Sequence, residues 1–555
     1  MSGNLSNSLS GNTLLNLNAN QGIKISGVSD VMVLQNLNNG TQFFSYTDKS
    51  KLTLNALGGD IHLNSDTKVI STILSIDENL SSVEKWLAHV YPASLDTTAF
   101  NGSAILDSDI ILYPSAMANV NMFAKQGISS NTNTDLGSGM YSLTMSDANT
   151  ALLANAFNTV GGNQDPTNSM FNTEIIDANG PQSPYMHGIE PLHKDNTSAR
   201  FVTQLGDISS VTINMSKQTI VQAGQDLVNS PILIQQNNAT DASIISADRD
   251  IKFVTDLDSN GSPTAANNSY QIQVAGPGNV LVKTGRNLDL GDSVGMTTVG
   301  NFLNPALLPT GANLDILIGL NGGTPNYVAF INKYLLANPL YTKDYAKLTT
   351  FITPYMQQVS GNSQLSNADA LAEFLALTPI QTLAIQPQLN AILTPVFFNE
   401  LKLAGTASAA DKTKGNAGGF TAIETLFPGN KWQGELTIPF SKIQTISGGD
   451  INLFVPGGQV NAGLAVAPTG AKTPDKLGIV AQTQGAINAY VKNDFTVNTS
   501  RVFTLGGGDI VIWSSEGNID AGKGAKSALA VTVNAPYFDK ITNQIVIPAP
   551  TITSG

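Results

Sequence analysis

The sequence predicts an all-β solenoid, a right-handed parallel β-helix that carries an inserted α-helical subdomain and smaller loop or helix excursions. A repeated unit occurs twice near the C-terminus, as SGGDINLFVPGGQVNAGLA at 447–465 and GGGDIVIWSSEGNIDAGKGAK at 506–526. The chain has 50 glycines and only 12% charged residues, a composition that favours tight turns and stacked strands over helix surfaces. Acidic residues at 207, 226 and 250 lie 19 and 24 residues apart, close to the roughly 20 to 25 residues of one solenoid coil.

Each copy of the unit combines a glycine turn, an Asp or Asn, and a short apolar strand. The strand alternates its side chains between two faces, and Ile510 and Ile512 are predicted to point inward. Glycine accepts a positive φ, and an Asx side chain can bond its own backbone two residues further on, so both suit the turns. Stacking of equivalent strands lets each coil bury a face that it could not bury alone. The predicted repeat turns contain Gly449, Asp450, Gly458, Gly508, Asp509, Gly517 and Asn518.

An antiparallel sandwich or propeller also contains many short strands and turns, and it is the competing fold. Two observations speak against it. The Asn-Gly and Asp-Gly dipeptides typical of tight hairpins are scarce, and the repeat aligns Asp with Asp in the same chain direction. The parallel β-helix is therefore favoured.

The longest interruption of the strand pattern, at 305–412, has apolar residues at helical spacing and predicts an inserted helical subdomain. Asn326 and Asn367 are plausible N-caps within it, and Gly405 is a plausible helix stop. One of its apolar stripes is predicted to form the core of the subdomain or its seat on the β-helix, rather than a groove for a partner. This stripe consists of Phe397, Phe398 and Leu401.

Two smaller interruptions complete the predicted organisation. Val83, Trp86, Leu87 and Val90 have helical spacing and predict a short helical excursion, while 146–160 predicts one helix inside a long polar insertion. The predicted order is coils at 1–75, the helical excursion at 76–104, a coil at 105–130, an irregular insertion with one helix at 131–200, coils at 201–304, the helical subdomain at 305–412 and C-terminal coils at 413–555.

Composition excludes several classes of protein. The chain has no cysteine, which excludes disulfides and thiolate metal sites. Its net charge of −13 supplies no basic stripe for phosphates, so nucleic acid is not an expected partner. No apolar span of about 20 residues predicts a transmembrane helix, and the first residues lack the pattern of a signal peptide. The protein is therefore expected to be either intracellular or a piece of a longer exported chain, and the opening residues, which resemble the middle of a strand array, favour the piece.

Two clusters contain residue types found in metal sites. His187, Glu190 and His193 stand close together, but Pro191 disrupts any shared helical face, so a solvated loop is the favoured interpretation. The second cluster resembles the first half of a calcium loop, but Asn267 stands where a bidentate Glu is needed. It is interpreted as a turn, and no cofactor is expected. Its candidate ligands are Asp256, Asp258 and Asn260.

Asp450 and Asp509 could form a carboxylate pair for glycoside cleavage, because some polysaccharide-degrading enzymes are β-helices. Glycosidase carboxylates must converge on one bond within about 5 to 9.5 Å, whereas these two residues stand in equivalent turns of successive units. A structural ladder is therefore favoured over catalysis. Trp432 and Trp513 could stack on sugars, but a strand tryptophan is more often a packing residue.

Several motifs in one order resemble the C-terminal region of filamentous-haemagglutinin-like large exoproteins. The resemblance covers most of 190–530. It implies a passenger of two-partner secretion in Gram-negative bacteria, exported by a dedicated outer-membrane transporter and folded outside as a long β-helix. It supplies no catalytic residues. The motifs are PLHKDNTSARFVTQLGDI at 191–208, VFFNELKLAG at 396–405, GFTAIETLFPG at 419–429, GGDINLFVPGGQVNAGLA at 448–465 and NTSRVFTLGGGDIVIWSSEGNIDAGKGAKSA at 498–528.

The sequence and the resemblance together predict a secreted or cell-surface structural adhesin segment without catalytic activity. Its loops and helical insert would bind a host or bacterial receptor or glycan, whose identity the residues do not indicate. A polysaccharide-active β-helix enzyme and a stalk for a C-terminal toxin are the alternatives. A dedicated outer-membrane transporter is the one further partner that the resemblance implies.

Overall fold

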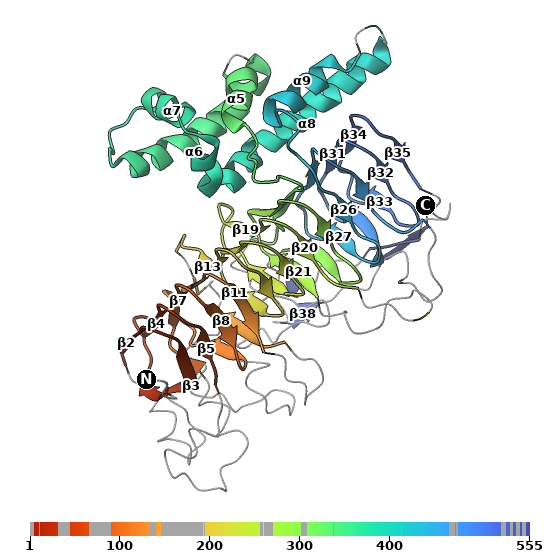
Figure 1. The fold of residues 1–555 in the computed structure, drawn as a ribbon. Coiled ribbons are helices and arrows are strands. Elements are labelled where there is room, and N and C mark those ends of the chain that lie inside the picture. The colour runs from red at the N-terminus through yellow and green to blue at the C-terminus, as the bar shows by residue number, and fades with distance from the viewer. Residues whose placement is uncertain are drawn as a thin grey trace.

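The chain winds repeatedly through three parallel sheets, and from β7 to β35 each turn of the chain adds one strand to each sheet (Figure 1). We call these sheets 1, 2 and 3. The computed structural model therefore confirms the predicted parallel β-solenoid with a helical insert; its right-handed sense stays a prediction. The residues that the structure describes are 5–9, 11–30, 45–65, 90–131, 140–145, 192–193, 195–255, 259, 270–300, 308–336, 338–411, 413, 415–465, 472, 476–522, 529–532, 537–539, 544–546 and 551–554.

Sheet 2 contains the longer strands, and they pair in register along the whole rod. Leu17, Leu54 and Thr97 are register partners on three successive strands, for example, and their side chains face the interior. The alternate residues form columns on the outer face of the sheet. In spatial order the strands are β2 (Leu14–Ala19), β4 (Lys51–Ala56), β7 (Ser94–Ala99), β10 (Val120–Ala124), β13 (Ala199–Thr203), β16 (Thr219–Ala223), β19 (Ala242–Ala247), β22 (Asn279–Thr284), β25 (Asn313–Leu317), β28 (Ile451–Val455), β31 (Ile487–Val491) and β34 (Ile510–Ser514).

Sheet 1 follows sheet 2 across a tight corner. Most of its strands have only two residues, because the chain soon turns again toward sheet 3. In spatial order the strands are β1 (Leu5–Leu9), β3 (Ile23–Asp30), β5 (Ile61–Leu63), β8 (Ser103–Leu106), β11 (Gly127–Ser130), β14 (Ile208–Ser209), β17 (Leu227–Val228), β20 (Ile251–Lys252), β23 (Leu288–Asp289), β26 (Leu436–Thr437), β29 (Val460–Asn461), β32 (Phe495–Thr496) and β35 (Ile519–Asp520).

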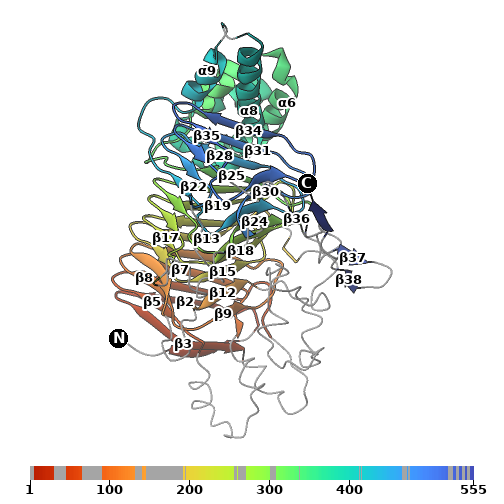
Figure 2. The same cartoon turned by 90° about the vertical axis from the view of Figure 1, so that its right-hand side faces the viewer.

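Sheet 3 forms the third side of the rod (Figure 2). The three sheets enclose one continuous apolar core. This core runs along the rod from Leu9 to Val497 and consists mainly of buried Ile, Leu, Val and Ala. Burial of such side chains is the main favourable term in folding. In order along the rod the strands are β6 (Val90–Tyr91), β9 (Ile110–Leu112), β12 (Ser142–Met145), β15 (Thr212–Met215), β18 (Ile232–Gln235), β21 (Gln271–Ala275), β24 (Gly295–Val299), β27 (Lys442–Thr445), β30 (Gly478–Ala481) and β33 (Val502–Thr504).

The helical insert interrupts one coil between β25 and β26 and lies on the outer face of sheet 2 (Figure 1). The coil closes across the interruption, because β25 pairs with β28 and β23 pairs with β26. None of the described helices is both long enough and apolar enough to cross a membrane. The helical elements are α5 (Tyr327–Phe330), the π-helix η7 (Ile331–Leu335), the 3₁₀-helix η8 (Pro339–Tyr341), α6 (Thr342–Ser360), α7 (Asn367–Leu375), the 3₁₀-helix η9 (Pro379–Ile385), α8 (Gln386–Ala410) and α9 (Ala417–Leu426).

The ends of the predicted segments differ from the structure at several places. The excursion predicted at 76–104 is wrong over 90–104, where β6, β7 and the start of β8 are coil strands; the rest of it lies outside the described residues. Tertiary pairing of a short apolar segment overrides its helical spacing there. The helix predicted at 146–160 also lies outside the described residues.

The helical insert begins and ends later than the predicted 305–412. β25 still belongs to the solenoid, and α9 extends the helical region into the segment predicted as coils from 413. Four strands at the C-terminal end pair antiparallel rather than as coils, β36 (Leu529–Thr532) with β39 (Thr551–Ser554) and β37 (Tyr537–Asp539) with β38 (Gln544–Val546).

Of the three residues predicted to begin or end helices, only Asn326 has the predicted role. Asn326 caps α5, and its side chain accepts a hydrogen bond from the Ala329 N–H. Asn367 is the first residue of α7, whose N-cap is Ser366. Gly405 does not stop α8, which continues to Ala410, because glycine inside a helix costs only about 1 kcal/mol and the packed neighbours outweigh that cost.

Candidate functional site

The face of sheet 2 under the helical insert carries a column of large side chains. Leu317, Phe454, Tyr490 and Trp513 are successive register partners on β25, β28, β31 and β34. In a parallel sheet in register, equivalent residues stack directly above one another. Four residues that are far apart in the sequence therefore form one continuous apolar surface, and α8 packs against this face.

Phe397 of α8 joins the insert to this column. Its ring centroid lies 5.5 Å from that of Phe454, 5.9 Å from Tyr490 and 6.1 Å from Phe427 of the α9 end. Phe398 adds a second contact with Phe454 at 5.1 Å. The predicted stripe of the insert is thus its seat on the solenoid and part of the same apolar cluster, which also includes Leu401.

Both candidate sugar-stacking tryptophans are packing residues. Trp432 is buried, and its indole N–H donates to the Phe427 carbonyl at 3.2 Å. Trp513 is also buried and lies so close to α9 that a Cβ at Gly419 would approach its ring within 2.3 Å. Neither ring face is available to a ligand, which removes the binding interpretation of these two side chains.

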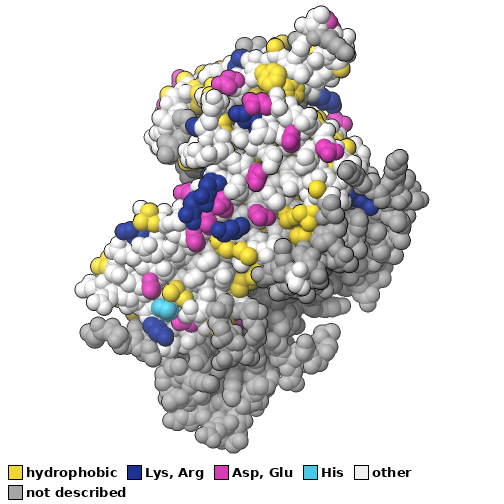
Figure 3. All heavy atoms as spheres, turned by 45° about the vertical axis from the view of Figure 1, so that its right-hand side comes forward, with side chains coloured by type: hydrophobic (Ala, Val, Ile, Leu, Met, Phe, Trp, Pro, Cys, Tyr) yellow, Lys and Arg dark blue, Asp and Glu magenta, His cyan; other side chains and the backbone are white. Residues whose placement is uncertain are grey.

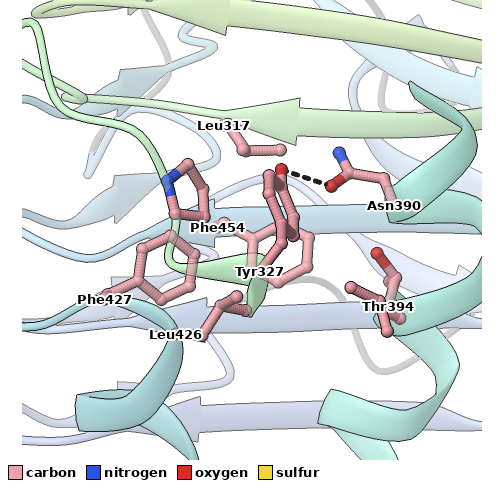
Figure 4. A pocket seen from close by; sticks show the side chains of 9 residues that line it. Leu317, Tyr327, Asn390, Thr394, Leu426, Phe427 and Phe454 are labelled. Atoms are coloured by element: carbon pink, nitrogen blue, oxygen red, sulfur yellow. Dashed lines mark hydrogen bonds between the residues drawn. The ribbon is translucent and has the colours of Figure 1, made fainter. Parts of the chain in front are cut away.

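A small cavity remains where the insert meets the solenoid (Figure 4). It has room for about one water molecule. The Tyr327 hydroxyl donates to the Asn390 side-chain oxygen at 2.7 Å and accepts from the Gln386 amide at 2.9 Å. Within the described part of the chain, the buried Asn390 amide nitrogen has no partner. This cavity suits a structural water and is too small for a substrate.

Beside the aromatic column, the same face of sheet 2 holds a buried polar column. The Asn488 amide donates to the Asn452 oxygen at 2.9 Å, and the Asn452 amide donates to Asp315 at 2.8 Å. Asp315 is only 1% exposed. Burial raises the pKa of Asp315 to about 7, although the hydrogen bond from Asn452 opposes that rise. The column therefore ends in an acid that is costly to ionise.

The Asp and Asn residues of the corners between sheets 2 and 1 form a ladder that we call the Asx ladder. Asp207 accepts from the Asp226 N–H at 2.8 Å, and Asp226 accepts in turn from the Asp250 N–H at 3.1 Å. Asp250 accepts from the Asn287 N–H at 2.9 Å, and the Asn287 side chain accepts from the Glu435 N–H at 3.1 Å. Each corner side chain therefore satisfies a backbone donor of the following coil.

Asp450 behaves in the same way at the corner before sheet 2, where it accepts from the Ala486 N–H at 2.7 Å. The predicted bond from an Asx side chain to its own backbone two residues on is therefore wrong at this corner. It does occur after the short strands, where Asp520 accepts from the Gly522 N–H at 2.8 Å. Sequence periodicity identified the residues but not their partners, because the partner belongs to another coil.

Close stacking explains the corner glycines better than a positive φ does. Gly449 has φ of 94°, as predicted, but Gly458, Gly508 and Gly517 are not in the left-handed region. A Cβ at Gly458 would lie 1.8 Å from the Gly434 carbonyl oxygen of the neighbouring coil. At Gly508 the distance to the corresponding carbonyl oxygen would be 1.7 Å. The coils therefore approach too closely for any side chain at these positions.

Charged residues gather where the Asx ladder crosses four coils, a group that we call the charged corner (Figure 3). Arg249 makes two hydrogen bonds to Asp226, at 2.8 and 3.0 Å, and Lys252 lies 3.1 Å from the same carboxylate. Burial opposes the ionisation of Asp226, but Arg249 and the other donors outweigh burial and lower its pKa. The charged corner consists of Asp207, Asp226, Arg249, Asp250, Lys252 and Arg286.

The proposed carboxylate pair does not converge. Ala486 stands between Asp450 and Asp509 in the order of the coils, so their backbones are about 10 Å apart at about 4.8 Å per coil. Asp509 accepts a hydrogen bond from Lys402 of α8 at 2.7 Å, which lowers its pKa. Asn518, the next corner residue, gives its N–H to Asp494 at 2.7 Å. All of these polar groups serve contacts between coils or with the insert.

The metal candidates are mostly outside the described residues. Of the first cluster only His193 is described, and it is buried with its Nε2 2.7 Å from the Ser216 hydroxyl. The described part of the chain contains no group of three or more His, Cys, Asp or Glu that could hold a metal ion. The candidates that fall outside the described residues are His187, Glu190, Asp256, Asp258 and Asn260.

The comparison with protein families matches the end of the chain. Residues 507–555 match the model of a family described as "Filamentous haemagglutinin family outer membrane protein". The match includes β34 and β35, the last two strands of the solenoid. Neither a curated protein nor a solved structure matches the chain. From the last coil onward, the chain is therefore similar to this family, which agrees with the resemblance found in the sequence.

Proposed function

We propose that this chain is a non-catalytic segment of a secreted or cell-surface adhesin. The solenoid is a stiff stalk, and the helical insert together with exposed loops binds a receptor or glycan on a host or bacterial cell. The observation that carries the proposal is the way the insert is mounted. It projects from one side of the rod (Figure 1), and the buried aromatic column anchors it there.

The family match supports the surface location, because its description names an outer membrane protein. The chemistry of the acids supports a non-catalytic role. The corner acids on which a glycosidase would depend accept hydrogen bonds from backbone N–H groups of neighbouring coils, or pair with basic side chains. These contacts support a structural role for the corner carboxylates.

Export through a dedicated outer-membrane transporter belongs to the same proposal. A chain without cysteine forms no disulfide that would hinder passage in an unfolded state. Coexpression with a candidate transporter tests this part. Release of the chain into the medium only when the transporter is present is the expected result.

Binding of the purified chain to epithelial cells, bacterial cells and a glycan array tests the adhesin role. We expect binding to at least one of these probes and no release of sugar from any glycan. Turnover of a glycan, or no binding to any probe, would contradict the proposal.

Two matched double variants locate the binding surface. L336S/L340S changes exposed apolar residues of the insert, and L57S/F100S changes equally exposed residues on a corner of the stalk. We expect the insert variant to bind at least about tenfold more weakly, which corresponds to 1.4 kcal/mol. The stalk variant should bind like the parent chain. The reverse pattern would place the binding surface on the stalk.

A further inference from the structure

The C-terminal end of the solenoid is open. β33, β34 and β35 are the outermost strands of their sheets, and none has a strand on its outer side among the residues that the structure describes. Ile510 is 44% exposed and Ile519 is 52% exposed. Their register partners in the preceding coil, Ile487 and Phe495, are fully buried. The end of the apolar core is therefore exposed at the last coil.

The same end presents a row of backbone donors. In the preceding coil, the Ile487 N–H donates to the Asp509 carbonyl of the last coil at 2.9 Å. The register-equivalent N–H in the last coil belongs to Ile510, and that of Phe495 corresponds to Ile519. Both N–H groups face the position that a further coil would occupy. An open edge with apolar residues is a template for another parallel strand.

The segment after this edge has the spacing of one more coil. Four residues separate β37 from β38, and four separate β34 from β35. Four residues separate β36 from β37, where the two preceding coils have five between the equivalent strands. From β36 to β39 the starts of the strands lie 22 residues apart, and from β30 to β33 they lie 24 apart.

We propose that β36, β37 and β38 dock on the open end as a further coil and add in parallel to β33, β34 and β35. β39 then begins the next turn of sheet 3. The occupant of the open end is thus the chain's own C-terminal segment.

The antiparallel pairs β36–β39 and β37–β38 are a second arrangement of the same strands. Connections of four residues suit a hairpin as well as a solenoid corner. The antiparallel arrangement leaves Ile510 and Ile519 exposed, whereas the docked coil covers both and also supplies acceptors for their N–H groups. Burial of apolar surface and satisfaction of backbone donors both favour the docked coil.

Hydrogen exchange of the full chain, resolved to single residues, distinguishes the two arrangements. Both protect amides within β36–β39, but only the docked coil protects the outward N–H groups of Ile510 and Ile519. We expect these two amides to exchange at least about 100-fold more slowly than an unprotected amide. The Ile487 amide inside the stack serves as the reference for a protected site.

A substitution in β36 provides a second test of the docked coil. Val531→Pro removes a strand N–H from β36 and prevents its regular pairing. We expect the Ile510 and Ile519 amides to lose at least about tenfold of their protection in this variant, while Ile487 stays protected and shows that the rod is folded. Unprotected Ile510 and Ile519 in the parent chain would overturn the proposal. So would protection that rises with protein concentration, because a second copy would then cover the end.

Discussion

The outer face of sheet 2 has two halves with the same backbone and different side chains. One register column runs through Asn18, Asn55 and Thr98 near the N-terminal end of the rod and continues through Phe454 and Tyr490 near the other end. Among the described residues, no helix packs on the first half, which we call the bare half. The second half is covered by the helical insert. The inward residues therefore determine the solenoid, whereas the outward residues determine what covers it.

In the bare half, polar side chains of neighbouring coils form hydrogen bonds on the outer face of sheet 2. The Asn55 amide donates to Asn18 at 2.9 Å, and the Asn121 amide donates to Asp96 at 3.0 Å. Lys51 also pairs with Asp96. In the covered half a similar ladder ends in Asp315, which burial makes hard to ionise. The same kind of hydrogen bond therefore lies at the surface in one half and is buried beside an acid of raised pKa in the other.

The largest difference between the halves is expected from removing a phenylalanine. Phe397→Ala empties the centre of the covered interface, where the side chain is fully buried, and we expect a loss of about 3 to 5 kcal/mol in the free energy of unfolding. Phe123→Ala, on the outer face of the bare half, should cost less than about 1.5 kcal/mol because the ring is half-buried. Urea unfolding monitored by circular dichroism measures both. Equal losses would mean that the insert is not anchored by this cluster.

Replacing a corner glycine by alanine should lower the free energy of unfolding by a similar amount in both halves. Gly458→Ala forces a methyl group against the Gly434 carbonyl, and Gly206→Ala does the same in the bare half against the Gln126 carbonyl. We expect each to lower the unfolding free energy by about 2 to 4 kcal/mol through overpacking and backbone displacement. Gly405→Ala in α8 has open space around it and should be neutral or stabilising by up to about 1 kcal/mol. A tolerated Gly458→Ala would contradict the close stacking of the corners.

Asp315 should make the stability of the covered half depend on pH. Because its pKa rises from 3.8 to about 7 on folding, its favourable contribution is complete below pH 3.8 and is lost as the pH rises through 7. Asp315→Asn continues the amide ladder without a charge. We expect this variant to be more stable than the parent by about 1 to 3 kcal/mol at pH 8, with little difference at pH 4. Urea midpoints at several pH values measure the effect, and a parallel shift at every pH would exclude it.

Substitutions of Asp226 separate the two kinds of interaction that its carboxylate makes, a hydrogen bond from a backbone N–H and ion pairs with basic side chains. Asp226→Asn keeps an oxygen for the Asp250 N–H but loses the ion pairs with Arg249 and Lys252, whereas Asp226→Ala loses both. We expect a cost of about 1 to 2 kcal/mol for Asp226→Ala and about half of that for Asp226→Asn. Thermal unfolding at low and high salt measures the two variants. Equal costs would assign the whole effect to the ion pairs.

The smallest effect is expected for the contact between the insert and the last coil. Lys402 and Asp509 are both exposed, and surface ion pairs of this kind contribute little. Lys402→Ala should change the unfolding free energy by less than about 0.5 kcal/mol. A cost above about 1.5 kcal/mol in the same urea assay would show that this pair, rather than the aromatic column, holds the insert.

The repeat made the fold predictable from sequence. The spacing of the corner acids and the alternation of the strands indicated parallel coils, since both patterns follow from local chemistry. The coils at 90–104 were missed because the helical spacing through Val90 competes with pairing to strands that are distant in the sequence. The extent of the helical insert was also misjudged, because α9 follows a polar stretch that resembles a loop.

The surface on which the insert packs could not be predicted from any single segment of the sequence. Phe454, Tyr490 and Trp513 belong to three coils, and only their shared register brings them together. The hydrogen bonds of the corner acids could not be predicted for the same reason, because Asp450 and its donor Ala486 are 36 residues apart. Sequence periodicity indicates that residues are equivalent, but the packing of one coil on the next determines what they contact.

Distances between spin labels along one outer column test whether the coils stack in parallel and in register. The chain has no cysteine, so labels at introduced cysteines are the only ones. Asn18 and Gln222 lie five coil steps apart in one column, and Asn55 and Gln222 lie four steps apart. Pulsed electron resonance should therefore give backbone separations of about 24 and 19 Å, a difference of one coil spacing. Equal distances, or a longer distance for the second pair, would contradict the stacked parallel rod.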